Sequence, residues 1–115
     1  MRRGEIRLVN PDPTLGEEAN KRRPAVIVSN DGANLTAENL GRGVVTVVPV
    51  TSNVTRIYPF QVLLDAQATG LDRDSKAQAE QVRSVAVARV GTRVGVLNSD
   101  QIAALDEALR LHLAL

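Results

Sequence analysis

Six runs along the chain have the hydrophobic patterns of β-strands. Residues 5–9 alternate polar and apolar side chains, as expected of a strand with one buried face. Residues 24–29 contain three consecutive β-branched side chains, which predicts a strand buried on both faces. The other runs are residues 44–49, 60–64, 76–85 and 87–96, with glycines expected to bend the last of them.

The C-terminal pattern is that of a helix. Ser99 is placed to cap it, and an acidic residue in the first turn suits the positive end of the helix dipole. The apolar stripe consists of Ile102, Leu105, Leu109 and Leu113. A short helical turn is also expected at residues 33–40. Short strands followed by one helix predict a mainly β fold, with a small, closed or nearly closed antiparallel sheet and a packed C-terminal helix.

The junction between residues 21–23 and the second predicted strand is the chemically suggestive segment. Three cations precede Pro24, which lacks a backbone N–H and therefore suits the first position of a strand. Arg23 would then sit where a long polar loop becomes a rigid strand. The third strand ends in Thr51 and Ser52, so two strand ends could bring a guanidinium and a hydroxyl together.

Composition supports one domain over residues 1–115 with a single core. Hydrophobic residues make up 43% and charged residues 23%, but aromatic residues only 2%, so aliphatic side chains must fill the core. There is no cysteine, and no apolar run is long enough to span a membrane, which favours the cytoplasm. The net charge is +1, yet twelve of the fourteen cations are arginine, the side chain that binds phosphates bidentately.

Several kinds of chemistry are disfavoured by the residues present. The only histidine, His112, lies in the predicted helix, where a surface position is expected, and the carboxylates lack a metal-ligand spacing. We find no phosphate-binding glycine loop, nucleophile elbow or dinucleotide fingerprint. Arginines, hydroxyls and carboxylates remain. Such a set suits phosphoryl chemistry without a metal or cofactor when the substrate supplies its own nucleophile, as RNA does through its 2′-hydroxyl.

Six short motifs, in this order and spacing, resemble those of the MazF/PemK toxin family. They are GEI at 4–6, DPT with a following glycine at 12–16, RPAVIVS at 23–29, PVTS at 49–52, YPF at 58–60 and QVRS at 81–84. The resemblance implies a small SH3-like barrel of the MazF/PemK/CcdB type. It also implies a cytoplasmic endoribonuclease that cleaves single-stranded RNA at short sequences without a metal. A homodimer and a MazE-like antitoxin partner are implied as well.

The same resemblance assigns site residues. The family's paired arginine and threonine fall on Arg23 and Thr51, and its loop glutamate falls on Glu18, with Glu17 adjacent. The candidate RNA-binding residues are Lys21, Arg22, Ser52, Tyr58, Gln81 and Arg83. Two positions depart from the family pattern: Arg7 replaces an aromatic residue and Asn10 an aspartate. These changes bear on loop order, substrate preference and activity.

Each candidate also has a purely structural interpretation. Arg23 is interpreted as a phosphate clamp because its guanidinium stays protonated, rather than as a solvated strand end. Thr51 either contacts the phosphate or 2′-hydroxyl, or is satisfied by the backbone. Glu18 is either a proton acceptor or an ion-pair partner of Lys21 or Arg22.

The weaker candidates remain open in the same way. Tyr58 either stacks on a base or packs within a turn, and Phe60 is expected in the core. Ser52 and Gln81 are more simply explained by hydrogen bonds at a sheet end. The cations Arg56, Arg73, Lys76 and Arg83 either follow the RNA backbone or, as the default, lie on a solvated surface. The alternative function is a non-catalytic binding module on the same fold, either a gyrase-poison-like protein or a relative that only holds its antitoxin.

Overall fold

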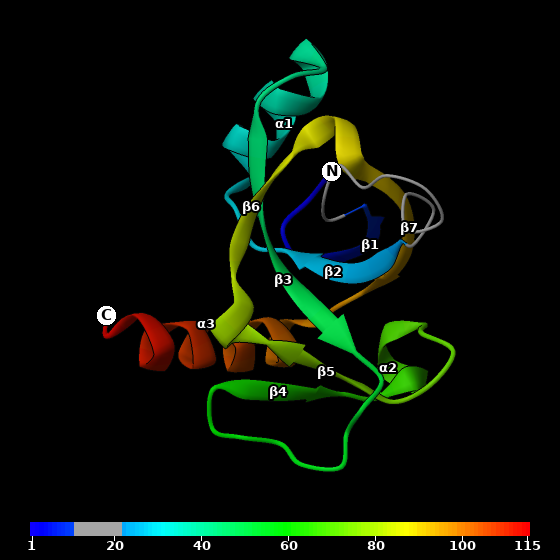
Figure 1. Cartoon of the computed structure of the whole chain (residues 1–115), viewed down its shortest axis with the longest axis vertical. Helices are drawn as coiled ribbons and strands as arrows, with labels where there is room; N and C mark the ends of the chain where they lie inside the picture. The colour runs from blue at the N-terminus through cyan, green and yellow to red at the C-terminus, as the bar shows by residue number, and fades with distance from the viewer. Residues whose placement is uncertain (11–21) are drawn as a thin grey trace.

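The computed structural model describes residues 1–10 and 22–115. The described strands are β1 (Glu5–Val9), β2 (Arg23–Ile27), β3 (Val44–Thr51), β4 (Gln61–Leu64), β5 (Ser75–Gln78), β6 (Arg83–Ala86) and β7 (Val90–Val96). The helices are α1 (Asp31–Leu40), α2 (Ala66–Thr69) and α3 (Ser99–Leu113), with 3₁₀ turns η2 (Ala79–Gln81) and η3 (Val87–Arg89). The fold is therefore mainly β with a C-terminal helix, as predicted (Figure 1).

All seven strands belong to one antiparallel sheet in the order β4-β5-β3-β2-β1-β7, with β6 paired to β3. The central strand β3 is longer than predicted, because it continues beyond Pro49 to Thr51. Its first half pairs with β6 and its last two residues pair with β5. Figure 1 shows β3 running from α1 at one end of the molecule to α2 near the other.

Several predicted boundaries need correction. β2 begins one residue earlier than expected, at Arg23, and ends at Ile27. The single strand predicted at 76–85 is two strands, because η2 interrupts it and lets β5 and β6 pair with different halves of β3. The strand predicted at 87–96 begins only at Val90, after η3. The segment 65–74, for which the sequence pattern predicted no helix or strand, contains the short helix α2.

The C-terminal helix is capped by Asn98 rather than Ser99. The Asn98 side chain accepts a hydrogen bond from Gln101 N, while the Gln101 side chain accepts one from Asn98 N, which forms a reciprocal capping box. The predicted apolar stripe faces the sheet through Ile102, Leu105 and Leu109. Its last member, Leu113, is 48% exposed, because the helix extends past the sheet there.

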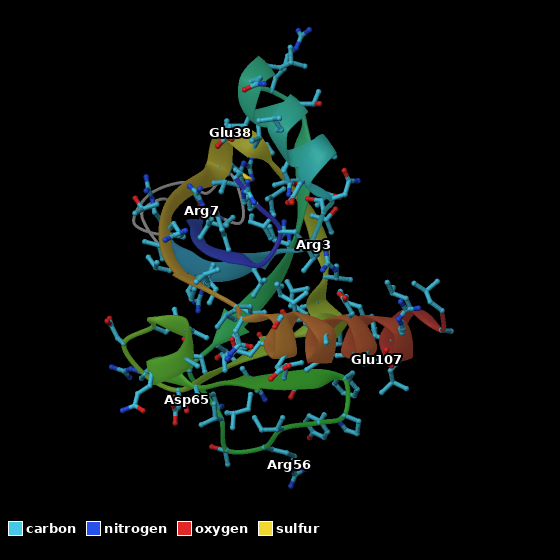
Figure 2. All side chains as sticks on the ribbon, turned by 180° about the vertical axis from the view of Figure 1, so that it is seen from behind. Arg3, Arg7, Glu38, Arg56, Asp65 and Glu107 are labelled. Atoms are coloured by element: carbon cyan, nitrogen blue, oxygen red, sulfur yellow. The ribbon has the colours of Figure 1, made fainter. Side chains whose placement is uncertain are left out.

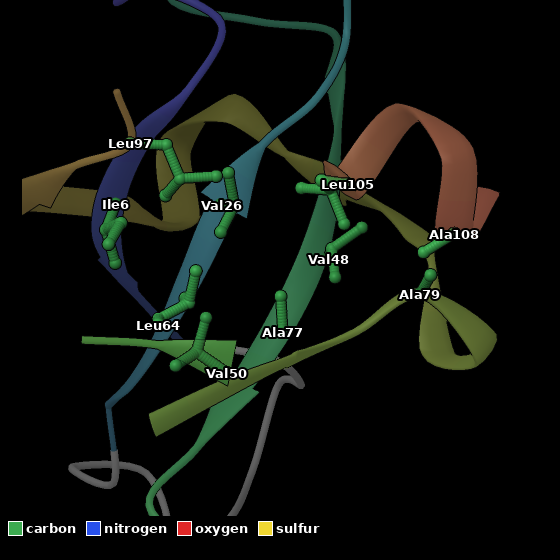
Figure 3. Close-up of a cluster of buried hydrophobic side chains, with 10 residues drawn as sticks. All are labelled: Ile6, Val26, Val48, Val50, Leu64, Ala77, Ala79, Leu97, Leu105 and Ala108. Carbon is green, nitrogen blue, oxygen red and sulfur yellow. The ribbon is translucent and has the colours of Figure 1, made fainter. Parts of the chain in front are cut away.

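Two clusters of buried aliphatic side chains form the core. The larger one lies between β1–β5 and α3, with η2 and the residue after β7 contributing, and its members are Ile6, Val26, Val48, Val50, Leu64, Ala77, Ala79, Leu97, Leu105 and Ala108 (Figure 3). The second lies toward α1 and contains Val9, Ala25, Ile27, Ala37, Val45, Val47, Val85 and Val87. Together they hold β2 and β3 rigidly side by side, and that pair carries the candidate site.

Candidate functional site

Arg23 and Thr51 occupy facing ends of two neighbouring strands. In the ladder between β2 and β3, Ala25 pairs with Pro49, and continuing this register by two residues places Arg23 opposite Thr51. Both residues line one open pocket of about 600 Å³. The structure therefore places these two predicted site residues in the lining of the same pocket, and their roles there stay predictions.

Among the described residues, three arginines, three hydroxyl side chains and one carboxylate line the pocket together with apolar side chains. Its polar residues are Arg22, Arg23, Arg73, Thr51, Ser52, Ser75 and Asp72. Its other lining residues are Leu8, Pro24, Val50, Gly70, Leu71 and Val94. The start of β2 and the end of β3 contribute to this lining, and so do residues 70–73, between α2 and β5. Among these described residues, guanidinium groups outnumber carboxylates, a balance that favours the binding of anions.

Arg22 fits closely beside β7. A Cβ on Gly91 would lie 3.1 Å from Arg22 Nη1 and 3.2 Å from the carbonyl oxygen of Leu8. The absence of a side chain at Gly91 therefore leaves the space in which the Arg22 guanidinium lies. This places two consecutive arginines, Arg22 and Arg23, along the same pocket.

Three of the predicted RNA-binding residues lie elsewhere. Tyr58, on the connection between β3 and β4, stacks against Phe60 with ring centroids 5.3 Å apart. Phe60 is half-buried rather than a core residue, because this stack lies on the surface. Gln81 is exposed at the end of η2, and Arg83 is exposed at the start of β6. The pocket lining includes none of Tyr58, Phe60, Gln81 and Arg83.

Two further cations surround the aromatic stack. Arg56 lies 5.7 Å from the Tyr58 ring centroid, and Lys76 lies 5.9 Å from it. Lys76 is buried, and its ammonium donates to the Arg56 carbonyl oxygen at 2.7 Å. The expectation of a solvated Lys76 is therefore wrong, because it holds the β3–β4 connection against β5. Figure 2 shows Arg56 on this connection, at the edge of the molecule.

Glu17, Glu18 and Lys21 lie outside the described residues, so their roles stay predictions.

Sequence reasoning missed Asp72 and Ser75 and left Arg73 as a default surface cation. The available signal was the run of charges at residues 72–74. It could not be interpreted without the fold, because this segment reaches the Arg23–Thr51 pocket only through the pairing of β5 with the end of β3.

Arg7, which replaces the family's aromatic residue, is held within the sheet. Its guanidinium contacts Glu5 and the carbonyl oxygen of Gly91, linking β1 to β7. Burial raises the pKa of Glu5, but hydrogen bonds from Arg7 and Arg2 and the charges of Arg7 and the amino terminus outweigh it, so the pKa is lowered overall.

The backbone N–H of Asn10, the second departure, donates to the carbonyl oxygen of Arg89 at 3.1 Å. Neither Arg7 nor Asn10 lines the pocket.

Within residues 1–10 and 22–115, no group of three or more histidine or acidic side chains is arranged to hold a metal ion. Over the same ranges, no helix has both the length and the apolar character needed to cross a membrane.

Comparison with known proteins agrees with this fold. The family model for the PemK-like, MazF-like toxin of type II toxin–antitoxin systems matches residues 2–113. The chain is 62% identical to the endoribonuclease MazF9 of Mycobacterium tuberculosis, over 100% of this chain and 98% of the relative. It is 28% identical to the endoribonuclease EndoA of Bacillus subtilis, over 100% of this chain and 96% of that protein.

A solved structure, the Mycobacterium tuberculosis toxin MazF-mt6, superposes with a TM-score of 0.75 at 24% identity, covering 96% of this chain and 97% of that one. The seven antiparallel strands and the C-terminal helix thus form the fold that the motifs implied. The chain belongs to the family of PemK-like, MazF-like toxins of type II toxin–antitoxin systems.

Proposed function

We propose that this protein is a toxin endoribonuclease that cleaves single-stranded RNA at short specific sequences without a metal. The observation that carries the proposal is that Arg23 and Thr51, from the adjacent strands β2 and β3, line one arginine-rich pocket. The naming of the 62% identical relative as an endoribonuclease supports the same activity.

The proposed reaction uses the nucleophile that RNA carries. The 2′-hydroxyl oxygen attacks the adjacent phosphorus, and the bond from phosphorus to the 5′-oxygen breaks. The 2′-hydroxyl proton passes to a base, and the leaving 5′-oxygen takes up a proton. The products are a 2′,3′-cyclic phosphate and a 5′-hydroxyl end. Because charge increases on the phosphate oxygens in the transition state, fixed donors aimed at them accelerate the step.

Arg23 and Thr51 supply these donors in the proposal. The Arg23 guanidinium offers paired N–H groups to the phosphate, and its strand position next to Pro24 limits its reorganisation. The Thr51 hydroxyl contacts a phosphate oxygen or orients the 2′-hydroxyl. Glu18, with Glu17 as its neighbour, is the proposed proton acceptor, and ion pairing with Lys21 or Arg22 is the alternative role.

The proposed partners are a second copy of the chain and a MazE-like antitoxin. Exposed apolar side chains that a second copy could cover include Leu35, Leu40, Val44, Val96, Leu111, Leu113 and Leu115. An acidic, partly disordered antitoxin segment would bind the arginine-rich pocket in competition with RNA. Sedimentation at micromolar concentration tests the dimer, and a purely monomeric species would refute it. The proposed location is the cytoplasm.

The test is to incubate the protein with long RNA in excess EDTA and to map every new end. We expect a small set of sequence-related cuts with 2′,3′-cyclic phosphate and 5′-hydroxyl ends, at the same rate with and without chelator. Loss of cleavage in EDTA would refute the metal-independent mechanism. An absence of cleavage under both conditions would favour the non-catalytic binding module.

A further inference from the structure

The segment 65–74, which contains α2 and leads into β5, forms one wall of the pocket. Asp65 caps α2 by accepting from Gln67 N at 2.8 Å, and Asp74 Oδ1 accepts from Ala66 N at 2.9 Å, which ties the two ends of the segment together. Thr69 is buried and its hydroxyl donates to the Asp65 carbonyl oxygen at 2.9 Å. These hydrogen bonds hold both ends of the turn from which Leu71, Asp72 and Arg73 line the pocket.

The wall also packs directly on β7. A Cβ on Gly95 would lie only 2.7 Å from the carbonyl oxygen of Thr69, so the two backbones approach as closely as they do because residue 95 is glycine. Gly70 then ends α2 with a φ of +90°, a conformation that glycine adopts without strain. The turn that follows presents Leu71, Asp72 and Arg73 to the pocket.

The carboxylate of Asp72 would be unfavourable in a pocket that binds only phosphate, because the two groups carry the same charge. It is exposed, and it forms no hydrogen bond or ion pair with any residue of the described ranges. An ionised carboxylate is acceptor-only and repels a phosphate, so it weakens RNA binding unless the RNA offers it a donor. The donors on an unpaired nucleotide, besides its 2′-hydroxyl, are on the edge of its base.

We propose that Asp72 reads the Watson–Crick edge of one RNA base next to the cleaved phosphate and favours a base with an amino group over uracil. This inference rests on the proposed RNA-cleaving function and deepens it by naming a specificity residue. The pocket, at about 600 Å³, is in the size range of sites that enclose a small molecule, and it is larger than one phosphate needs. Leu71 and Val94 in its lining provide apolar surface for a base.

The preference follows from the pattern of donors on each base. Cytosine and adenine present an amino group at this edge, and guanine presents an amino group beside a ring N–H. Uracil presents one ring N–H between two carbonyl oxygens, which a carboxylate repels. A well-placed contact of this kind discriminates between bases by roughly 5- to 100-fold in binding.

The test measures binding to RNA that cannot be cut. Ten-nucleotide oligomers of cytidine, adenosine or uridine, each fully 2′-O-methylated, cannot undergo attack by the 2′-oxygen. We expect the wild-type protein to bind the cytidine and adenosine oligomers several-fold more tightly than the uridine oligomer. In Asp72→Asn, whose amide can donate to a uracil carbonyl, the ratio of these affinities should fall close to one.

Glu107→Gln is the matched control, because it removes one negative charge from an exposed side chain on α3, away from the wall that Asp65 begins (Figure 2). It should leave the ratio unchanged. An equal ratio in wild type and Asp72→Asn, or equal binding of the cytidine and uridine oligomers by wild type, would overturn the inference. This assay involves no cleavage. A protein that binds these oligomers selectively but cuts no RNA would therefore refute the proposed nuclease function, while base recognition by Asp72 would still be supported.

Discussion

Arg7 binds Glu5 through two nitrogens: its Nε and Nη2 atoms lie 3.0 and 2.8 Å from the same Glu5 oxygen, Oε1. The third nitrogen, Nη1, donates to the carbonyl oxygen of Gly91 at 3.1 Å. Glu5 is 9% exposed, so this pair is largely shielded from water. Breaking a shielded pair by removing one charge leaves the other charge unsatisfied, which costs more than losing a surface ion pair.

Glu5→Gln should therefore make stability less sensitive to acid. The pKa of Glu5 is lowered in the folded state, so its carboxylate contributes stability above its usual value of 4.5, and this contribution is lost as pH falls through the lower folded pKa. We expect urea unfolding at pH 7 to show a loss of about 1–3 kcal/mol relative to wild type. The difference should shrink below pH 4. A difference that stays constant with pH would contradict the assignment.

Arg23→Ala should abolish measurable RNA cleavage while the fold and the dimer persist, because Arg23 is exposed and contributes to no core cluster. Loss of one preorganised donor to the transition state costs roughly 10²–10³ in rate. Arg23→Lys should recover little, since an ammonium cannot form paired hydrogen bonds. Arg42→Ala, at an exposed site outside the pocket, is the control for charge and should cleave normally. A wild-type rate from folded Arg23→Ala would refute the mechanism.

Thr51→Ala should slow cleavage severely, and Thr51→Ser only mildly, since serine retains the hydroxyl. Thr51 Oγ1 also accepts a hydrogen bond from Asn53 N at 3.3 Å, so the alanine variant loses a turn contact as well. Single-turnover rates separate the two effects, because a turn defect would weaken RNA binding without changing the rate of the bound complex. Equal single-turnover rates for the alanine variant and wild type would show that the hydroxyl takes no part in the chemistry.

Gly95→Ala should displace the α2 wall. The added methyl group would meet the Thr69 carbonyl oxygen at 2.7 Å, and backbone must shift to relieve this contact. We expect a loss of about 1–3 kcal/mol in the free energy of unfolding. Selectivity between cytidine and uridine oligomers should also weaken. Thr92→Ala, at an exposed site on the same strand, should change stability by less than about 0.5 kcal/mol. An unaltered melting curve for Gly95→Ala would argue against the close packing.

Asn98→Ala should destabilise the protein by about 0.5–2 kcal/mol, because it removes the side chain that accepts from Gln101 N at 2.8 Å. Ser99→Ala is the paired comparison. Ser99 is the first residue of α3 and its replacement should be nearly neutral. Thermal or urea unfolding of the two variants distinguishes the caps, and a larger loss for Ser99→Ala would reverse the assignment.

The hydrophobic pattern predicted the strands well where a single periodicity continued, as in β1 and at the start of β3. It failed where tertiary pairing decides where a strand is interrupted. Nothing local in residues 76–85 indicates that the chain turns at η2, so that β5 and β6 pair with different parts of β3. The choice of Ser99 over Asn98 failed because both residues are good caps, and only the register of the first turn selects between them.

The candidate site was predictable only in part, because some of its residues are brought together by long-range strand pairing. Arg23 and Thr51 stand at strand ends that the sequence marks with a proline and with a polar run, so their meeting follows from one antiparallel pairing. Asp72 and Ser75 needed a second pairing, between β5 and the end of β3, which short-range patterns do not encode. Arg7 lies outside the pocket because it points to Glu5 and Gly91.

The division of the pocket between two strand ends and the separate α2–β5 segment has a consequence for how such genes diverge. Under the proposed mechanism, mutations in codons 71–73 of a duplicated gene would alter which RNA bases the copy recognises, while Arg23 and Thr51 on the strands stayed unchanged. Copies within one genome could thus acquire different targets by drift in three codons, without passing through an inactive ancestor.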